Sequence, residues 1–481
     1  MPSRLPPAQA RGVSEVRSIH RTGRCIKPLF LSLFLTALGM TFVQVTLGTA
    51  QSVSAGPMQE DHSDRPPLSQ PLSVERKVTD LSGTWLELDD LIAQAVKNNP
   101  EILMLQARTA VQQHKVPQAK SLPDPMFMVG YQNEGFQRIT IGEEPNAMGM
   151  FSLSQMFPFP GKRDLKGKMA SREAESTAAM AESIRLKVVS RVTDVYYDLL
   201  LAYKTIDILR ARTALFSQIE DAASARYASG MGPQQEVVMA QTEKYMLLER
   251  EEMQNQRLQA LEGMLNATVG REVDAPLARP RERVKTPFTL TLDDAISTAR
   301  SHSPELRAKE RMVEAAQAKV KMAEKEYYPD VTLAGGYFPK TKGLMDMWSL
   351  SATVNLPIFF RTRQREGVLE AEAALSEARR DWRATDYMIA SNVRENFSMA
   401  AAADRLMKLY TDGLIPKTNQ DVQLALSGYV TGKTEAITVI SRLRGLLDAE
   451  LLYWTQYVER EKAIGRLHAV MGASRAQGGQ L

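Results

Sequence analysis

The stretch FSLSQMFPFPGKRDLKGK, residues 151–168, changes its periodicity within a single short segment. Apolar and hydroxyl side chains alternate at its start, prolines follow at Pro158 and Pro160, and a charged, proline-free run begins at Lys162. Alternation with a period of two is typical of a strand, whereas the charged run has the composition of a helix. The segment therefore predicts a strand that ends at the prolines and is followed directly by a helix.

The same change of periodicity occurs a second time, in WSLSATVNLPIFFRTRQREG at residues 348–367. Further segments match between the two halves of the chain. The matched pairs are 86–102 with 290–306, 121–127 with 326–332, and 226–230 with 428–432. Self-similarity of this kind indicates a duplicated structural unit, so we expect two tandem repeats rather than several unrelated domains.

The N-terminal residues have the pattern of a secretory signal peptide. Six basic residues precede the apolar run from Leu29 to Val45, and small residues suitable for cleavage follow at Ala50 and Ala55. A membrane-anchor helix is the alternative, but the run is short and is interrupted by polar side chains. We expect the following division: signal peptide 1–55, extended polar N-terminal segment 56–84, first repeat 85–270, inter-repeat linker 271–287, second repeat 288–471 and disordered tail 472–481.

Charge and cysteine content exclude several classes of protein. Removal of residues 1–55 would leave nearly equal numbers of basic and acidic side chains, which gives a nucleic-acid partner no electrostatic support. The single cysteine, Cys25, precedes the apolar run and would leave with the signal, so disulfides and thiolate zinc sites are excluded. No catalytic motif is recognisable in the sequence; we expect no enzyme and no cofactor.

Four segments are predicted to be strands: 126–132, 148–157, 331–338 and 348–356. Their length, near ten residues, is the length that crosses a bilayer when the strand is tilted. A half-buried sheet of a soluble protein is the alternative, but the sequence offers nothing to cover the apolar face. The polar face is expected to line a lumen with the following residues: Ser152, Ser154, Ser349, Ser351, Thr353 and Asn355.

Very long helices are predicted to follow each pair of strands. The spans 162–228 and 361–427 contain one proline between them, Pro416, and each would be about 100 Å long at ~1.5 Å per residue. Shorter helices, 234–268 and 434–469, are expected to return antiparallel to them. Proline within a helix removes a hydrogen bond and bends the axis, so Pro416 predicts a kink and a movable second hairpin.

Four strands of membrane length cannot close a barrel, and an open sheet edge in lipid costs several kcal/mol per unpaired backbone group. The chain must therefore associate with copies of itself. Two copies would give eight strands and a filled interior, whereas three would give twelve strands and an open lumen. We favour three copies, with the helices continuing the tube outside the membrane.

The motifs together resemble those of the TolC family of outer-membrane efflux proteins. The resemblance covers residues 84–471 and is carried by the paired DDLIAQA…NNPEI and DDAISTA…HSPEL openings, the FPFPGKR junction, the RYASG and GYVTG turns, and LYTDGLIPKTNQDVQLAL at 409–426. It implies a mainly α protein with a transmembrane β-barrel portion: a homotrimer whose twelve-stranded barrel is continued by a long α-helical barrel. It also implies an outer-membrane location reaching into the periplasm, with outer-membrane lipid, a periplasmic adaptor protein and an inner-membrane pump, most simply of the RND type, as partners.

The resemblance assigns the two helix-to-helix turns to the periplasmic aperture and to the adaptor contact. The residues carried over are Arg226, Tyr227, Gly230, Tyr429, Gly432, Lys433 and Glu435. Ordinary αα-hairpin turns are the alternative, since glycine alone permits the backbone that such turns need. The aspartates that narrow the aperture in the family are replaced here by Thr438 and Ser441, which puts an acidic constriction in doubt.

The strand-to-helix junction is expected to mark the membrane surface. Its residues are Pro158, Pro160, Gly161, Lys162 and Arg163. Two of these side chains are cationic and are expected to reach lipid phosphate groups, with a plain solvated helix start as the alternative.

The substrate class is left open between drugs and metal ions. The 24 methionines are numerous for this length, and four of them share the parity of the lumen serines: Met126, Met128, Met148 and Met150. Thioether sulfur binds Cu(I) and Ag(I), although methionine more often fills gaps in a core. The alternative for the whole protein is a periplasmic coiled-coil scaffold or adaptor without a pore.

Overall fold

The computed structural model describes residues 85–140, 143–340 and 343–472. The chain divides into two units, residues 1–76 and 77–481, and all the described residues belong to the second. The predicted signal peptide, the polar N-terminal segment and residues 473–481 of the tail lie outside the described residues.

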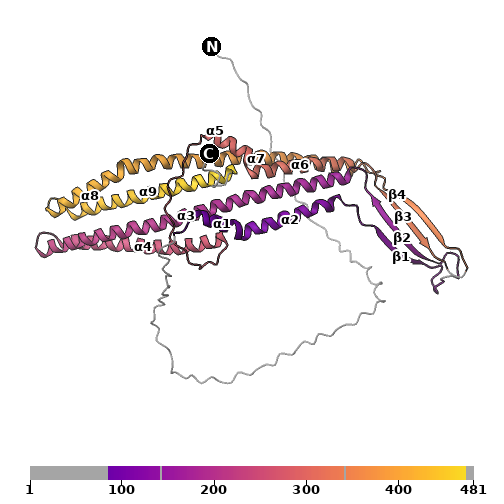
Figure 1. The fold of residues 1–481 in the computed structure, drawn as a ribbon, viewed down its shortest axis with the longest axis horizontal. Helices are drawn as coiled ribbons and strands as arrows, with labels where there is room; N and C mark the ends of the chain where they lie inside the picture. The colour runs from indigo at the N-terminus through magenta and orange to yellow at the C-terminus, as the bar shows by residue number, and fades with distance from the viewer. Residues whose placement is uncertain (1–84, 141–142, 341–342, 473–481) are drawn as a thin grey trace, which may run out of the picture. The chain divides into compact units, whose positions relative to one another are not determined.

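Each half of the described chain has the same order of elements (Figure 1). The first half contains α1 (Leu88–Asn98), α2 (Pro100–Lys120), β1 (Met126–Gln132), β2 (Met148–Phe157), α3 (Lys162–Ala228) and α4 (Gln234–Val269). The second contains α5 (Leu292–His302), α6 (Pro304–Lys325), β3 (Val331–Phe338), β4 (Met347–Val354), α7 (Gln364–Leu409), the π-helical turn η1 (Tyr410–Leu414), α8 (Ile415–Val430) and α9 (Ala436–Met471). The predicted duplication is confirmed, and the long helix of the second half is divided where that of the first half is continuous.

The four strands form one antiparallel sheet in the order β1-β2-β3-β4. The two hairpins of the two repeats therefore lie side by side, and β2 pairs with β3 across the boundary between the repeats. Figure 1 shows the sheet at one end of the helices and the turns α3–α4 and α8–α9 at the other. Among the described helices, none combines the length and the apolar character that crossing a membrane requires.

The helix α3 is the central element of the helical part. It runs unbroken for 67 residues, about 100 Å at ~1.5 Å per residue, and packs against α2, α4, α6 and α9. Its middle is buried over much of its circumference, since the three consecutive residues Val195, Tyr196 and Tyr197 are all buried. A helix buried on several sides needs neighbours on several sides, which explains why two shorter helices placed end to end, α2 and α4, accompany it on one flank.

Polar capping at the start of α2 connects two elements that are distant in the sequence. The side chain of Asn99 accepts hydrogen bonds from the backbone N–H of Glu101 and Ile102 (2.9 and 3.2 Å), and its amide donates to the carbonyl oxygen of Thr268 in α4 (2.7 Å). The helix α4 ends two residues later at Gly270, which has a φ of 83°. A Cβ at Gly270 would lie 2.5 Å from the carbonyl oxygen of Asn98, so this position requires glycine.

The second repeat ends its last helix in the same way. Gly472 has a φ of 77°, and a Cβ there would lie 2.5 Å from the carbonyl oxygen of His302. The short helix that opens each repeat is thus in contact with the end of the helix that closes it, and the two repeats are stabilised by equivalent contacts.

Candidate functional site

The register of the sheet assigns every strand residue to one of two faces. Directly opposite residues of antiparallel strands share a face, and Met128, Ser152, Gly336 and Ser349 are opposite one another in turn across the four strands. Met126, Ser154, Ala334 and Ser351 form the next such row. The predicted lumen serines therefore share one face with the methionines named from the sequence.

We call this face the hydroxyl face. Every methionine of the four strands lies on it: Met126, Met128, Met148, Met150, Met156 and Met347. Apart from Phe338 at the end of β3, its other residues are small or carry a hydroxyl or amide group, and no strand residue is ionisable at neutral pH. Met150 lies close against β1, since a Cβ at Gly130 would be 2.9 Å from its terminal methyl carbon.

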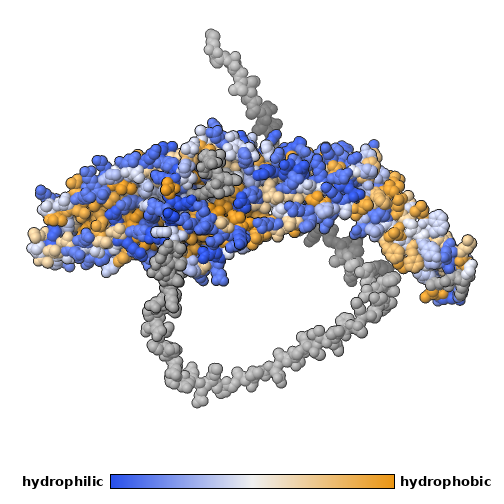
Figure 2. All heavy atoms as spheres, viewed as in Figure 1, coloured by the Kyte–Doolittle hydropathy of each residue, from blue (hydrophilic) through white to orange (hydrophobic). Residues whose placement is uncertain are grey.

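The opposite face, here called the apolar face, is aromatic and aliphatic. Its exposed side chains include Phe127, Val129, Phe151, Leu153, Leu333, Tyr337, Trp348, Leu350 and Val354. Trp348 is 79% exposed and Leu350 78%, which is far more apolar surface than a protein in water leaves uncovered. Figure 2 shows hydrophobic surface over the strands beside the mostly hydrophilic surface of the adjoining helices.

One predicted lumen residue, Asn355, lies outside the sheet, because β4 ends at Val354. Its backbone N–H donates to the carbonyl oxygen of Asp330 (3.2 Å), the residue that precedes β3. The strand ends here because Pro357 follows and supplies no backbone donor for the ladder. The assignment of Asn355 to the strand was therefore wrong, although the remaining five lumen residues lie in strands.

The junction after β2 is built into the protein rather than presented to solvent. The strand ends before Pro158, and Gly161 adopts a φ of 89° to begin α3. The ammonium group of Lys162 is buried and binds Oδ1 of Asp330 (2.9 Å), the carbonyl oxygen of Tyr328 (3.1 Å) and the carboxylate of Glu326 (3.4 Å).

These contacts correct the prediction that Lys162 reaches lipid phosphate, because its ammonium group is already neutralised by carboxylates of the second repeat. The neighbouring Arg163 donates two hydrogen bonds to the carbonyl oxygen of Lys120 (2.9 and 2.7 Å), so its guanidinium closes the end of α2. Phe159 is also engaged, since its ring stacks on that of Tyr328 with centroids 4.5 Å apart.

The two helix-to-helix turns are connected at their tips by Arg226 and Tyr429. The guanidinium of Arg226 donates to the carbonyl oxygen of Tyr429 (2.8 Å) and lies over its ring, 4.6 Å from the centroid. The phenol of Tyr429 donates to the carboxylate of Glu236 in α4 (3.0 Å). Burial, followed by the hydrogen bond to Glu236, raises the pKa of Tyr429 to about 12, so the phenol is a hydrogen-bond donor throughout the neutral range.

The remaining residues named for these turns are at the surface. Tyr227, Lys433 and Glu435 are exposed, and Gly230 and Gly432 have φ values of 71° and 73°.

Two further glycines of the turns, Gly232 and Gly428, do not have a positive φ. Gly428 is within α8, where a Cβ would clash with the side chain of Thr434, and Gly232 lies close to Arg226. Close approach, and not backbone conformation, is the reason for glycine at position 428.

Pro416 follows a π-helical turn. The five residues Tyr410–Leu414 form η1 immediately before α8, in which Pro416 occupies the first turn. Because proline supplies no N–H, the carbonyl group one turn earlier loses its usual partner, and a wider turn is a common accommodation. The equivalent part of α3 is regular.

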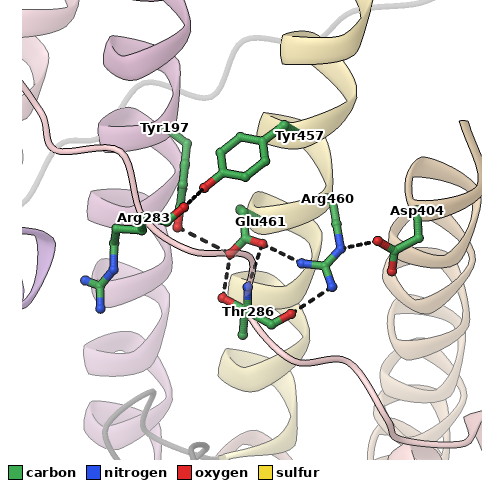
Figure 3. A network of polar contacts seen from close by, with 7 residues as sticks. All are labelled: Tyr197, Arg283, Thr286, Asp404, Tyr457, Arg460 and Glu461. Atoms are coloured by element: carbon green, nitrogen blue, oxygen red, sulfur yellow. Dashed lines mark hydrogen bonds and ion pairs between the residues drawn. The ribbon is translucent and has the colours of Figure 1, made fainter. Parts of the chain in front are cut away.

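A network that we did not predict from the sequence attaches the linker to the helices (Figure 3). Thr286 donates to the carboxylate of Glu461 through both its backbone N–H (3.1 Å) and its hydroxyl, and its carbonyl oxygen accepts from Arg460 (2.7 Å). Arg460 also binds Asp404 in α7 (2.6 Å), and the phenol of Tyr457 donates to the carbonyl oxygen of Arg283 (2.6 Å).

The charged pair at the centre of this network is removed from solvent, since the side chain of Glu461 is 0% exposed and that of Arg460 5%. Burial raises the pKa of Tyr457. The run Arg460-Glu461-Lys462 on an otherwise apolar helix was the available signal, because three ionisable residues in sequence cannot all face solvent. The sequence analysis also missed Glu236, which accepts the hydrogen bond of Tyr429 at the turns, and no sequence pattern distinguishes this residue.

An exposed apolar sheet face, an opposite face of hydroxyls and thioethers, and long antiparallel helices adjoining the sheet are the features of an outer-membrane channel protein. The family model described as "Outer membrane efflux protein" matches residues 91–270 and 295–473. The chain therefore belongs to the outer membrane efflux protein family, which acts in transport at the outer membrane, and its place of action is the outer membrane.

Known relatives agree with this assignment. The outer membrane protein OprJ of Pseudomonas aeruginosa is 23% identical over 422 residues, covering 82% of this chain and 86% of the relative. The cobalt-zinc-cadmium resistance protein CzcC of Cupriavidus metallidurans is 22% identical over 365 residues, covering 74% and 83%. The solved structure of the outer membrane protein VceC from Vibrio cholerae superposes with a TM-score of 0.71 at 19% identity, covering 80% of this chain and 96% of that one.

Proposed function

We propose that three copies of this chain form a passive exit duct that connects an inner-membrane pump with the outside of the cell. The observation that carries this proposal is the open four-stranded sheet, with β1 and β4 both unpaired on their outer sides and one face carrying many exposed aromatic and aliphatic side chains. In hydrocarbon such edges are costly unless neighbouring chains pair with them, and three chains give a twelve-stranded ring with an open interior.

The pump and the adaptor are part of the same proposal. The described chain has no nucleotide-binding motif and no ionisable residue on its strands, so the energy for export has to come from a partner. The relative CzcC is named a cobalt-zinc-cadmium resistance protein, which is consistent with a role in export. The partners that we propose are a pump of the RND type and a periplasmic adaptor. The exposed residues Tyr227, Lys433 and Glu435 are the proposed contacts for that adaptor.

A combined fractionation and conductance experiment tests the duct. The mature protein should remain in outer membranes after a high-salt wash, migrate as a heat-sensitive trimer and add conductance to a planar bilayer. A chain that is released by salt and adds no conductance would instead be a periplasmic scaffold or adaptor without a pore. A monomer in the membrane would refute the ring of three.

The turns are the proposed gate of the duct. Arg226, Tyr429 and Glu236 connect the two hairpins of one chain, so breaking this cluster should free one hairpin from the other. We expect Arg226→Ala to increase entry of large antibiotics into cells, with Arg250→Ala, which changes an exposed arginine of α4, as a matched control. Unchanged antibiotic entry with Arg226→Ala would mean that the cluster serves the fold alone.

A further inference from the structure

The two repeats can be aligned residue by residue within the sheet, which allows contacts seen inside the chain to be transferred to its free edges. The Pro-Asp pair before β1, at Asp124, matches the Pro-Asp pair before β3, at Asp330. The proline after β2, Pro158, matches the proline after β4, Pro357.

These two alignments are consistent with the observed hydrogen-bonded pairs. The first alignment matches Met128 with Ala334, and the second matches Ser152 with Ser351. The observed pair Met128↔Ser152 of β1 and β2 therefore predicts the pair Ala334↔Ser351, which is observed between β3 and β4. The internal symmetry of the sheet is therefore exact to the residue.

The interface between the repeats has two components. The first is the ladder between β2 and β3, in which Ser154 is opposite Ala334. The second is the junction below it, where Asp330 accepts from the ammonium group of Lys162 (2.9 Å) and from the backbone N–H of Phe159 (2.7 Å). The free edges β4 and β1 are the symmetry equivalents of β2 and β3, but their counterpart contacts are absent within the described chain.

We propose that Arg361 forms an ion pair with Asp124 of the partner subunit. This contact repeats the Lys162–Asp330 contact between one protomer and the next, and it rests on the trimer put forward as the proposed function. An arginine in place of the lysine retains the charge and adds the ability to bind a carboxylate with two nitrogens.

The two side chains of the proposed ion pair are free to make it. Asp124 and Arg361 are exposed, and neither has a hydrogen bond or an ion pair within the described residues; Arg361 lies only over the ring of Phe360, 5.8 Å from its centroid. Ile358 is 69% exposed and Leu122 37% exposed. These two occupy the positions of Phe159 and Tyr328, so an aliphatic contact replaces the stacked rings.

One position of the junction does not follow the symmetry. The counterpart of Glu326 is Lys120, a cation that would weaken the binding of a second cation. Its side chain, however, lies along α3 of its own protomer, since a Cβ at Gly167 would be 2.6 Å from its Cε. The missing contact is also the longest of the three that Lys162 makes, at 3.4 Å.

The same transfer predicts the register between protomers. When each residue of the pair Ser154↔Ala334 is replaced by its equivalent in the other repeat, Thr353 lies opposite Met128 of the partner subunit. The pair Phe151↔Tyr337 in the same way predicts that Leu350 lies opposite Tyr131 of the partner subunit. Thr353 and Met128 both belong to the hydroxyl face, and Leu350 and Tyr131 both belong to the apolar face. The predicted register therefore keeps each face continuous around the ring, which a shift of one residue would not.

Engineered cysteines test the register. The chain has one natural cysteine, so Cys25→Ser gives a thiol-free background. In that background, Thr353→Cys with Met128→Cys should give covalently linked protomers on a denaturing gel, because opposite residues have Cα atoms about 5 Å apart. Thr353→Cys with Met126→Cys places the thiols on a diagonal, about 7–8 Å apart, and should remain uncrosslinked.

Charge exchange tests the ion pair. Asp124→Arg and Arg361→Asp should each lower the temperature at which the trimer dissociates on a gel by on the order of 10 °C, and the double exchange should restore most of the loss. Glu134→Arg, an exposed acid at the far end of β1, is the control and should leave the trimer unchanged.

Each outcome supports or overturns a defined statement. A trimer that conducts but crosslinks only through the diagonal pair, or through neither pair, would overturn the register. A double exchange that is no more stable than the single variants would overturn the ion pair. A protein that neither forms a trimer nor conducts would overturn the proposed function, and the contact with it.

Discussion

Replacing Glu461 by glutamine should release the inter-repeat linker from the helices. The carboxylate of Glu461 is 0% exposed and accepts from both the backbone N–H and the hydroxyl of Thr286. Glutamine keeps the shape of the side chain but loses its charge. One of its two terminal atoms is then an amide nitrogen, which cannot accept a hydrogen bond from the backbone N–H or the hydroxyl of Thr286. Hydrogen bonds to a charged group contribute ~1.5–3 kcal/mol each, and a neutral acceptor recovers about 1, so the linker should open more easily by about 3 kcal/mol.

This free energy corresponds to about a 100-fold higher population of the opened linker. Limited proteolysis measures that population directly, because the linker contains the trypsin sites Arg281, Arg283 and Lys285. Cleavage there divides the protein into its two repeats, which are separated on a gel. We expect Glu461→Gln to be cleaved about 100-fold faster than the parent protein when opening is fast relative to cleavage.

The matched control is Glu459→Gln, which changes a residue 37% exposed whose carboxylate binds Lys462 at 3.3 Å. Ion pairs at the surface contribute little, so this variant should be cleaved at the parental rate. If the two variants were cleaved at the same rate, the buried network would not be what holds the linker, and the reasoning from burial would be refuted.

Three further predictions concern other parts of the chain. Gly270→Ala should lower the melting temperature measurably, because alanine would have to adopt a φ of 83° with its Cβ against the carbonyl group of Asn98; a variant as stable as the parent would show that the α1–α4 contact can move. Pro416→Ala should make the helix regular through η1 and alter both efflux and antibiotic entry, and unchanged values of both would rule out a moving second hairpin. If soft metal ions are exported along the hydroxyl face, copper and silver tolerance should fall when four methionines are replaced by leucine, whereas drug tolerance should not; equal tolerance to the metals would exclude a role for these thioethers. The four are Met126, Met128, Met148 and Met150.

The regular elements were predictable from the sequence because each has a period of its own. Alternation fixed β1, β2 and β3 to the residue, and the absence of proline fixed α3. The end of β4 was misplaced by two residues, since an alternating pattern continues past Val354 although hydrogen bonding does not. The long second helix was predicted whole, and the structure divides it before Pro416, where backbone hydrogen bonding and not periodicity is decisive.

The candidate site was predictable in part. Parity assigned the serines and four methionines to one face, and the observed register agrees with that parity on all four strands. The prediction for Lys162 was wrong, because the local sequence of a lysine near a proline pair does not show whether its ammonium group binds lipid phosphate or a buried carboxylate. Its partner Asp330 is 168 residues away in the sequence, and no local pattern connects the two.

The sequence alone determined the duplication, the lengths of the strands and helices, and the two chemically different faces of the sheet, because these follow from periodicities that are properties of neighbouring residues. The tertiary structure decided which ionisable groups are buried: Lys162 with Asp330, Arg460 with Glu461 and Thr286, and Arg226 with Tyr429. The physical reason is that the cost of burying a charge depends on whether a partner meets it in space, and most of these partners are brought together only when the two repeats pack against each other.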